Sequence, residues 1–288
     1  MQNLVDQVCE ESGLSVGEVE AAVEKLATML RSIPATMMYH YLGPEVEQFY
    51  SETGLRDSDA FHRLVLSKLI DSFDTDQLPL RLPDSMAALY AAEFARIRRN
   101  LEGADFAFSW DNDLFAKDMA IASGRLIPAG PGLLEISGVP RSLLFKRGIG
   151  QFFRFLAMLL FGLGGRAPLL TIHIHLSNVQ LFNPEGWEKS YKVIGEILEL
   201  NPEMKGLMRH AWFFDPVIAE ISPKLAYLRE IPEQFGAGIY YHSDEDADSG
   251  ALLRSARRRA LFEAGEYTPR VYYLLWPRER LIRYARTL

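Results

Sequence analysis

Two histidines stand two residues apart in TIHIHLSN, residues 171–178, and apolar residues surround them. The length and branching of LLTIHIHL are typical of a strand, on which His173 and His175 point the same way. The pair has three possible roles: ligands of a divalent metal, catalytic bases, or histidines satisfied in a core or interface. The spacing alone does not choose among these roles.

Metal hydrolysis is the most specific of these hypotheses. An H-x-H pair on one strand opens the barrel of metal-dependent amidohydrolases, where the metal activates a water. The chain after His175 is short for such a barrel, which takes roughly 250 residues in all. We therefore expect no metal, and a hydrolase using His173 and His175 is the third hypothesis for function.

A further histidine, His210, lies in MRHAWFFD on a predicted strand over residues 207–214. Alone it is typical of a core histidine. The following Asp215-Pro216 is more typical of a helix cap and first turn than of a catalytic acid. No G-x-S-x-G, Walker or G-x-G-x-x-G motif is present, and Cys9 lies in a helical region unlike that of a nucleophile.

Composition limits the class of protein. The chain has 288 residues, 48% of them hydrophobic, which is enough for a sizeable core. Its net charge of −7 disfavours a nucleic-acid partner, which usually meets a basic face. The single cysteine excludes an internal disulfide. The first residues carry acids and lack an apolar signal core, so we expect a cytoplasmic location.

The most apolar segment is FFRFLAMLLFGLGG, residues 152–165. It contains Arg154 and is shorter than the roughly 20 residues that a spanning helix needs, so we expect no transmembrane segment. It is predicted to be a buried helix. Contact with a membrane surface or a long acyl chain is the alternative.

The elements that must position these residues change in kind along the chain. Helical spacing dominates residues 1–104, beginning behind the capping box SVGE at residues 15–18. From residue 105 onward, short apolar runs alternate with helical patterns. The predicted strands include residues 169–176, 207–214, 236–242 and 269–277, and the predicted helices include residues 183–200 and 249–265.

This order predicts an α/β fold, or α+β with a mixed sheet, in which part of the sheet is parallel. We expect two domains: a helical N-terminal region over residues 1–104 and an α/β domain over residues 105–288.

Residues 169–216 resemble the GNAT-like acyltransferases of bacteria. In that pattern a strand carries a His-Ile-Pro-type motif, a helix opening with Pro and an acid follows, and a strand of the type His-Ser-Trp-Leu-Leu-Asp-Pro comes next. Here HAWFFDP (210–216) matches the last part, and His173-Ile174 matches the first, with His175 in place of the proline. The resemblance extends over roughly residues 130–240 and implies a GNAT-like C-terminal domain.

The GNAT resemblance also implies a loop whose backbone amides hold the pyrophosphate of coenzyme A at a helix N-terminus. KRGIGQ offers such a place: Gly148 and Gly150 allow close backbone approach, and Lys146 and Arg147 add positive charge. The family motif has Arg or Gln three residues before the first glycine, where this chain has Phe145.

The implied chemistry is transfer of an acyl group from a thioester, on coenzyme A or an acyl carrier protein, to a small-molecule amine. His173, His175 and His210 are the expected bases, since the pKa of histidine is near working pH. Tyr240 or Tyr241 is the expected proton donor to the leaving thiolate. An acyltransferase needs a cleft where two strands splay apart. A non-catalytic binding or scaffold protein, the competing class, would pack the histidines without a cavity.

Overall fold

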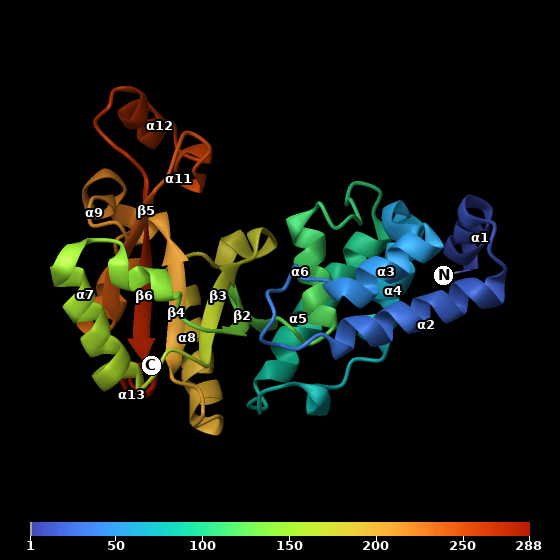
Figure 1. The fold of residues 1–288 in the computed structure, drawn as a ribbon, viewed down its shortest axis with the longest axis horizontal. Coiled ribbons are helices and arrows are strands. Elements are labelled where there is room, and N and C mark those ends of the chain that lie inside the picture. The colour runs from blue at the N-terminus through green and yellow to red at the C-terminus, as the bar shows by residue number, and fades with distance from the viewer. Residues whose placement is uncertain (1) are drawn as a thin grey trace. The chain divides into compact units, whose positions relative to one another are not determined.

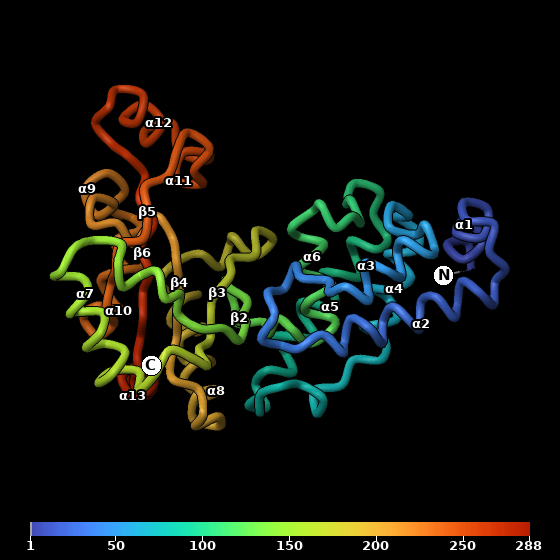
Figure 2. Tube along the Cα trace, viewed as in Figure 1, coloured from blue at the N-terminus to red at the C-terminus, as the bar shows by residue number. Residues whose placement is uncertain are grey.

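A computed structural model describes residues 2–288 and divides the chain into two compact units (Figure 1, Figure 2). Unit 1 consists of Met1–Ile136 and Ile174–Gln180, and unit 2 of Ser137–His173 and Leu181–Leu288. Residues 105–136 thus group with the helices of unit 1. The domain boundary that we expected after residue 104 stays a prediction.

Unit 1 is built mainly from helices. They are α1 (Gln2–Ser12), α2 (Val16–Ser32), α3 (Gly43–Thr53), α4 (Asp59–Asp71), α5 (Met86–Glu102) and α6 (Asp113–Ala122). The hairpin of β1 (Ile127–Ala129) and β2 (Gly132–Ser137) follows. The capping box predicted before α2 is confirmed, because the Ser15 amide donates to Glu18 at 2.8 Å and the Glu18 amide donates to Ser15 Oγ.

Helix α6 was not predicted from the sequence. Every residue from Phe115 to Ala122 is buried, including Lys117 and Asp118. A helix that is enclosed on all sides lacks the apolar and polar faces that mark a helix in a sequence. Its residues position much of the polar network of unit 1 described below.

Unit 2 contains a mixed sheet in which β3, β4, β6 and β5 lie side by side in that order. The strands are β3 (Leu169–Ile174), β4 (Gly206–Ala211), β5 (Gly238–Asp244) and β6 (Arg270–Pro277). Strands β3 and β4 are parallel, and β6 is antiparallel to both β4 and β5. Helix α8 (Pro184–Leu200) makes the crossover that a parallel pair requires. As predicted, Asn183 caps α8 by accepting from the Gly186 amide at 2.9 Å.

Helices cover both faces of this sheet (Figure 1). On one face, α7 (Gly148–Ala157) continues into a π-helical segment (Met158–Leu163) and buries Phe155 and Leu159 against Met208 and Tyr273. On the other face, α8 packs with α13 (Arg278–Ala285), and Tyr191 contacts Trp276 with ring centroids 5.2 Å apart.

Three predicted elements are shorter than expected. The predicted strand 169–176 ends at Ile174, so His175 lies beyond it. The predicted strand 207–214 ends at Ala211, and Trp212–Phe214 forms one helical turn. The predicted helix 249–265 is broken into α11 (Gly250–Leu253) and α12 (Ala256–Glu263), because Ser255 is extended and its side chain caps α12. The remaining helices of unit 2 are α9 (Ile218–Ile221) and α10 (Tyr227–Gln234).

The expected combination of helices and a mixed sheet is confirmed as a mixed α/β architecture. None of the helices within residues 2–288 has the length and apolar character needed to cross a bilayer.

Candidate functional site

The pairing between β3 and β4 is short. Its register joins Leu170 with Leu207 and Thr171 with Met208, and no later β3–β4 pair is present within residues 2–288. Strand β4 nevertheless continues in register with β6 through Ala211. The ladder therefore ends while both strands go on, so the carboxyl ends of the two parallel strands are not paired with each other beyond Thr171 and Met208.

A histidine follows the last β3–β4 pair on each strand. His173 follows Thr171 by two residues and His210 follows Met208 by two residues, so each lies just beyond that pair and on the same face of the sheet as the pair. Met208 belongs to the cluster beneath α7, so both histidines are on the face of the sheet that α7 covers. His173 is half-buried and His210 is exposed.

Tyr273 on β6 connects His210 to a further histidine on β5. The His210 ring stacks on the Tyr273 ring with centroids 5.2 Å apart and 23° between planes. The His242 ring contacts the same tyrosine at 5.3 Å. We call His173, His210, Tyr273 and His242 the histidine–tyrosine cluster.

Tyr240 pairs with Tyr273 in the β5–β6 register and is buried beneath α7. Its ring meets Phe155 edge-on at 5.1 Å, and its hydroxyl donates to the Arg154 carbonyl at 3.4 Å. Burial raises the pKa of Tyr240 to about 12 and also raises that of Tyr273. Both phenols therefore stay protonated near neutral pH and can donate a hydrogen bond or a proton.

Positive charge lies beside the cluster. Burial, and then the charge of Lys146, lower the pKa of His242 below its usual 6.5. The His242 imidazole is therefore neutral at physiological pH, with Nδ1 2.9 Å from Ser243 Oγ. Lys146 itself is exposed. The combination of a neutral histidine and a nearby free ammonium suits a site that takes up an anionic group.

The N-terminus of α7 supplies the other predicted phosphate-binding residues. Arg147 Nη1 donates to Tyr272 Oη at 3.1 Å, and its guanidinium lies 5.2 Å from the Tyr241 ring. Gly148 opens the helix at a φ of 61°, and no side chain caps the first turn. A Cβ added at Gly148 or Gly150 would meet no atom within 4 Å, so the surface there is open.

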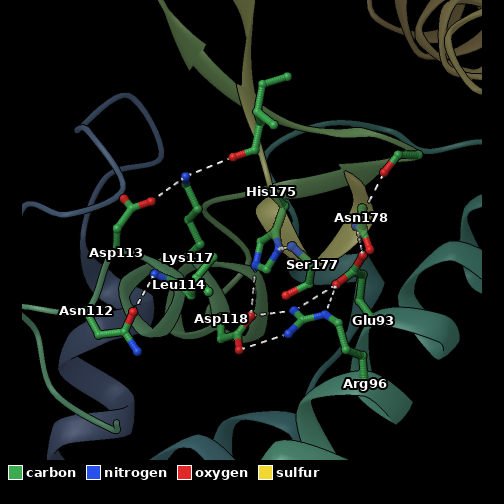
Figure 3. A network of polar contacts seen from close by, with 12 residues as sticks. Glu93, Arg96, Asn112, Asp113, Leu114, Lys117, Asp118, His175, Ser177 and Asn178 are labelled. Atoms are coloured by element: carbon green, nitrogen blue, oxygen red, sulfur yellow. Dashed lines mark hydrogen bonds and ion pairs between the residues drawn. The ribbon is translucent and has the colours of Figure 1, made fainter. Parts of the chain in front are cut away.

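His175, in contrast, lies in a polar network of unit 1 (Figure 3). It is fully buried; its Nε2 is 3.3 Å from Asp118 Oδ1, and its Nδ1 accepts from the Ser177 amide at 3.2 Å. Arg96 pairs with Asp118 and, at 2.8 Å, with Glu93. Both ring nitrogens are thus engaged, as in a structural histidine. The catalytic role expected for His175 stays a prediction.

His173 and His175 do not form a metal-binding pair in this geometry, since both ring nitrogens of His175 contact Asp118 and Ser177. Across residues 2–288, no group of three or more His, Cys, Asp or Glu side chains is placed to hold a metal ion.

The sequence did not single out Tyr273 and His242. Both strands that carry them were predicted, and alternation alone places Tyr240 and His242 on one face. The sequence did not reveal the register of the strands, which places Tyr273 between β4 and β5. That register depends on pairing between strands that are far apart in the chain.

No protein-family model matches the chain, and no curated protein sequence matches it. The chain is similar to a solved structure described as an acyltransferase in complex with decanoyl-CoA. The two share 14% sequence identity at a TM-score of 0.40, over 95% of this chain and 99% of that chain. At this identity and TM-score, the similarity establishes neither the fold nor the activity of this chain.

Proposed function

We propose that the protein is an N-acyltransferase that moves an acyl group from a thioester to an amine. The observation that carries this proposal is the early end of the β3–β4 ladder after Thr171 and Met208, with His173 and His210 on either side. In our proposal the two strands splay apart at this point to receive the thioester, whereas a scaffold would pack its histidines there.

An opening between two parallel strands suits the pantetheine arm that carries the thioester. The arm contains two amides, and an extended amide chain can add to strand backbone as a further strand would. The same arm is present in coenzyme A and in acyl carrier proteins. The opening therefore supports the thioester class and does not by itself select the carrier.

The α7 N-terminus favours coenzyme A. Backbone N–H groups in the first turn of a helix attract phosphate, and the helix dipole adds to that attraction. Here the turn has no capping side chain, Gly148 and Gly150 leave it open, and Lys146 and Arg147 precede it. In our proposal these four residues bind the pyrophosphate.

The cluster supplies the acid–base chemistry. In the proposed reaction His210 or His173, directly or through a water, takes a proton from the incoming ammonium. The free amine attacks the thioester carbonyl and forms the C–N bond. The C–S bond then breaks as the nitrogen loses its second proton, which returns to the tyrosine that protonates the thiolate. A tyrosine hydroxyl, Tyr240 or Tyr273, gives a proton to the departing thiolate; both phenols are protonated near neutral pH, as their raised pKa values require.

The test is a spectrophotometric assay of thiol release from acetyl-, octanoyl- and palmitoyl-coenzyme A, each mixed with a panel of primary amines. We expect amine-dependent thiol release that depends on acyl chain length and falls on His210→Ala. The matched control is His40→Ala, an exposed histidine of unit 1 that should leave the rate unchanged. Thioester binding without release would favour the non-catalytic binding class, and neither binding nor release would reject the proposal.

A further inference from the structure

The segment formed by α7 and its π-helical continuation, residues 148–163, is apolar on two opposite faces. The inner face packs Phe155, Leu159 and Leu163 on the sheet. The other face is exposed, with Phe161 87% and Ile149 76% accessible. We call Ile149, Phe153, Leu160 and Phe161 the outer face of α7. Within residues 2–288 no element covers these exposed apolar side chains.

The polar side chains of this segment are both turned toward the edge strand β5. They are Gln151 and Arg154. Gln151 bonds the backbone of Tyr241 twice, donating to its carbonyl at 2.8 Å and accepting from its amide at 2.9 Å. Arg154 donates to the Ile239 carbonyl at 3.4 Å and lies over the Tyr240 ring. No polar side chain of the helix is therefore left to hydrate the outer face.

The sequence stretch that contains the outer face carries a charge opposite in sign to that of the whole protein. Between Glu135 and Glu185 the sequence has no acidic residue, although the chain carries a net charge of −7. The same stretch contains five cations: Arg141, Lys146, Arg147, Arg154 and Arg166. Phe145, which is 78% accessible, directly precedes two of them. An apolar surface within a cationic stretch needs a partner that is apolar inside and anionic at its rim.

We propose that the outer face of α7 docks on the surface of an anionic lipid bilayer. Exposed Phe, Leu and Ile side chains enter the boundary between headgroups and acyl chains, while the exposed Arg141 and Arg166 contact the anionic headgroups. A second copy of this chain fits less well, because two identical cationic regions would face each other. The inference does not depend on the acyltransferase proposal.

The experiment is co-sedimentation of the full chain with vesicles of phosphatidylcholine plus phosphatidylglycerol, and with vesicles of phosphatidylcholine alone. We expect binding to the anionic vesicles that weakens at high salt, and much weaker binding to the neutral ones. The double variant Phe153→Ser with Phe161→Ser should bind at least about tenfold more weakly, since each exposed ring loses its transfer into the bilayer. Both side chains are exposed, so the fold should persist, as circular dichroism can check.

The matched control is Leu253→Ser on α11, another exposed apolar residue of unit 2, which should bind like the unchanged protein. Absence of binding to anionic vesicles would overturn the inference, and so would equal binding by the double variant. Gel filtration showing a dimer that the double variant converts to monomer, without vesicle binding, would assign the face to a second copy instead.

Discussion

His210 on β4 stacks on Tyr273 of the neighbouring strand β6, with ring centroids 5.2 Å apart. The stacking fixes the imidazole at the carboxyl end of a strand whose ladder with β3 has already stopped. In the proposed reaction this histidine is the base that takes a proton from the amine. The predictions below follow from this placement, from the charged helix end beside it, and from the buried polar groups of unit 1.

The two histidines beside the opening should act on the same step. We expect His210→Asn and His173→Asn each to lower kcat for acyl transfer, the more damaging one by about 100-fold or more, as loss of a general base does. The double variant should lose little beyond the worse single variant, because residues that act as a unit are not additive. Steady-state kinetics of the four proteins measure this, and two fully additive losses would contradict a shared role.

Lys146 should contribute to the binding of acyl-coenzyme A and not to the binding of acyl-pantetheine, the arm without the phosphates. Lys146→Ala is expected to raise KM for acyl-coenzyme A by about tenfold or more, the size of a lost hydrogen bond to a charged group. KM for the matching acyl-pantetheine, which lacks the phosphates, should stay the same. Arg141→Ala, which removes another exposed cation of the same segment, serves as the control. Equal effects on both substrates would remove Lys146 from the phosphate site.

The buried network of unit 1 should matter for stability. Asp118 is fully buried between Arg96 and His175, so Asp118→Ala leaves a buried guanidinium with less compensation. We expect the free energy of unfolding to fall by about 3–5 kcal/mol. Asp71→Ala, which breaks the exposed Asp71–Arg98 pair, should cost about 1 kcal/mol or less. Urea denaturation gives both values.

His175→Gln separates the two roles of that histidine. A structural role predicts a less stable protein whose folded fraction keeps its turnover, whereas a catalytic role predicts lost turnover at unchanged stability. Acyl-transfer assays and urea denaturation on the same preparation decide between them.

Stability should fall in mild acid because of His62. This side chain is buried between the Phe108 carbonyl, 2.6 Å from Nδ1, and Tyr50 Oη, 3.1 Å from Nε2. Burial lowers its pKa below 6.5, so the unfolded chain takes up a proton that the folded chain resists. Above the unfolded pKa, about 6.5, His62 costs the folded protein no stability. As the pH falls below that value, the free energy of unfolding decreases by at most about 1.4 kcal/mol per pH unit until the folded pKa is reached.

Urea denaturation from pH about 7.5 to about 5.5 tests this dependence. The slope should be reduced in His62→Gln, which has no proton to take up. His242, whose pKa is also lowered, contributes in the same direction and should account for part of the remaining slope. An unchanged slope in His62→Gln would place the acid sensitivity elsewhere.

Features set by neighbouring residues were predictable from the sequence. The Ser15–Glu18 capping box and the Asn183 cap with Pro184 depend on short-range spacing, and both are confirmed. Helix α6 was missed because burial on all sides removes its pattern. The early end of β4 at Ala211 depends on pairing across the sheet.

The same division holds for the candidate site. The polar character of His173, His210 and the α7 N-terminus was visible in the sequence. Their association with Tyr273 and His242 was not, because it follows from a register set between distant strands. The separation of His175 from His173 was equally hidden, since it depends on Asp118 from an unpredicted helix.

The central claim is that the opening between β3 and β4 receives the thioester, and hydrogen exchange with and without octanoyl-coenzyme A tests it most directly. Bound thioester should slow amide exchange in peptides covering residues 171–173 and 208–211, at the opening, and residues 146–150, at the α7 N-terminus. Unchanged exchange in these peptides at ligand concentrations that raise the melting temperature would contradict the claim, because the thioester would then bind elsewhere.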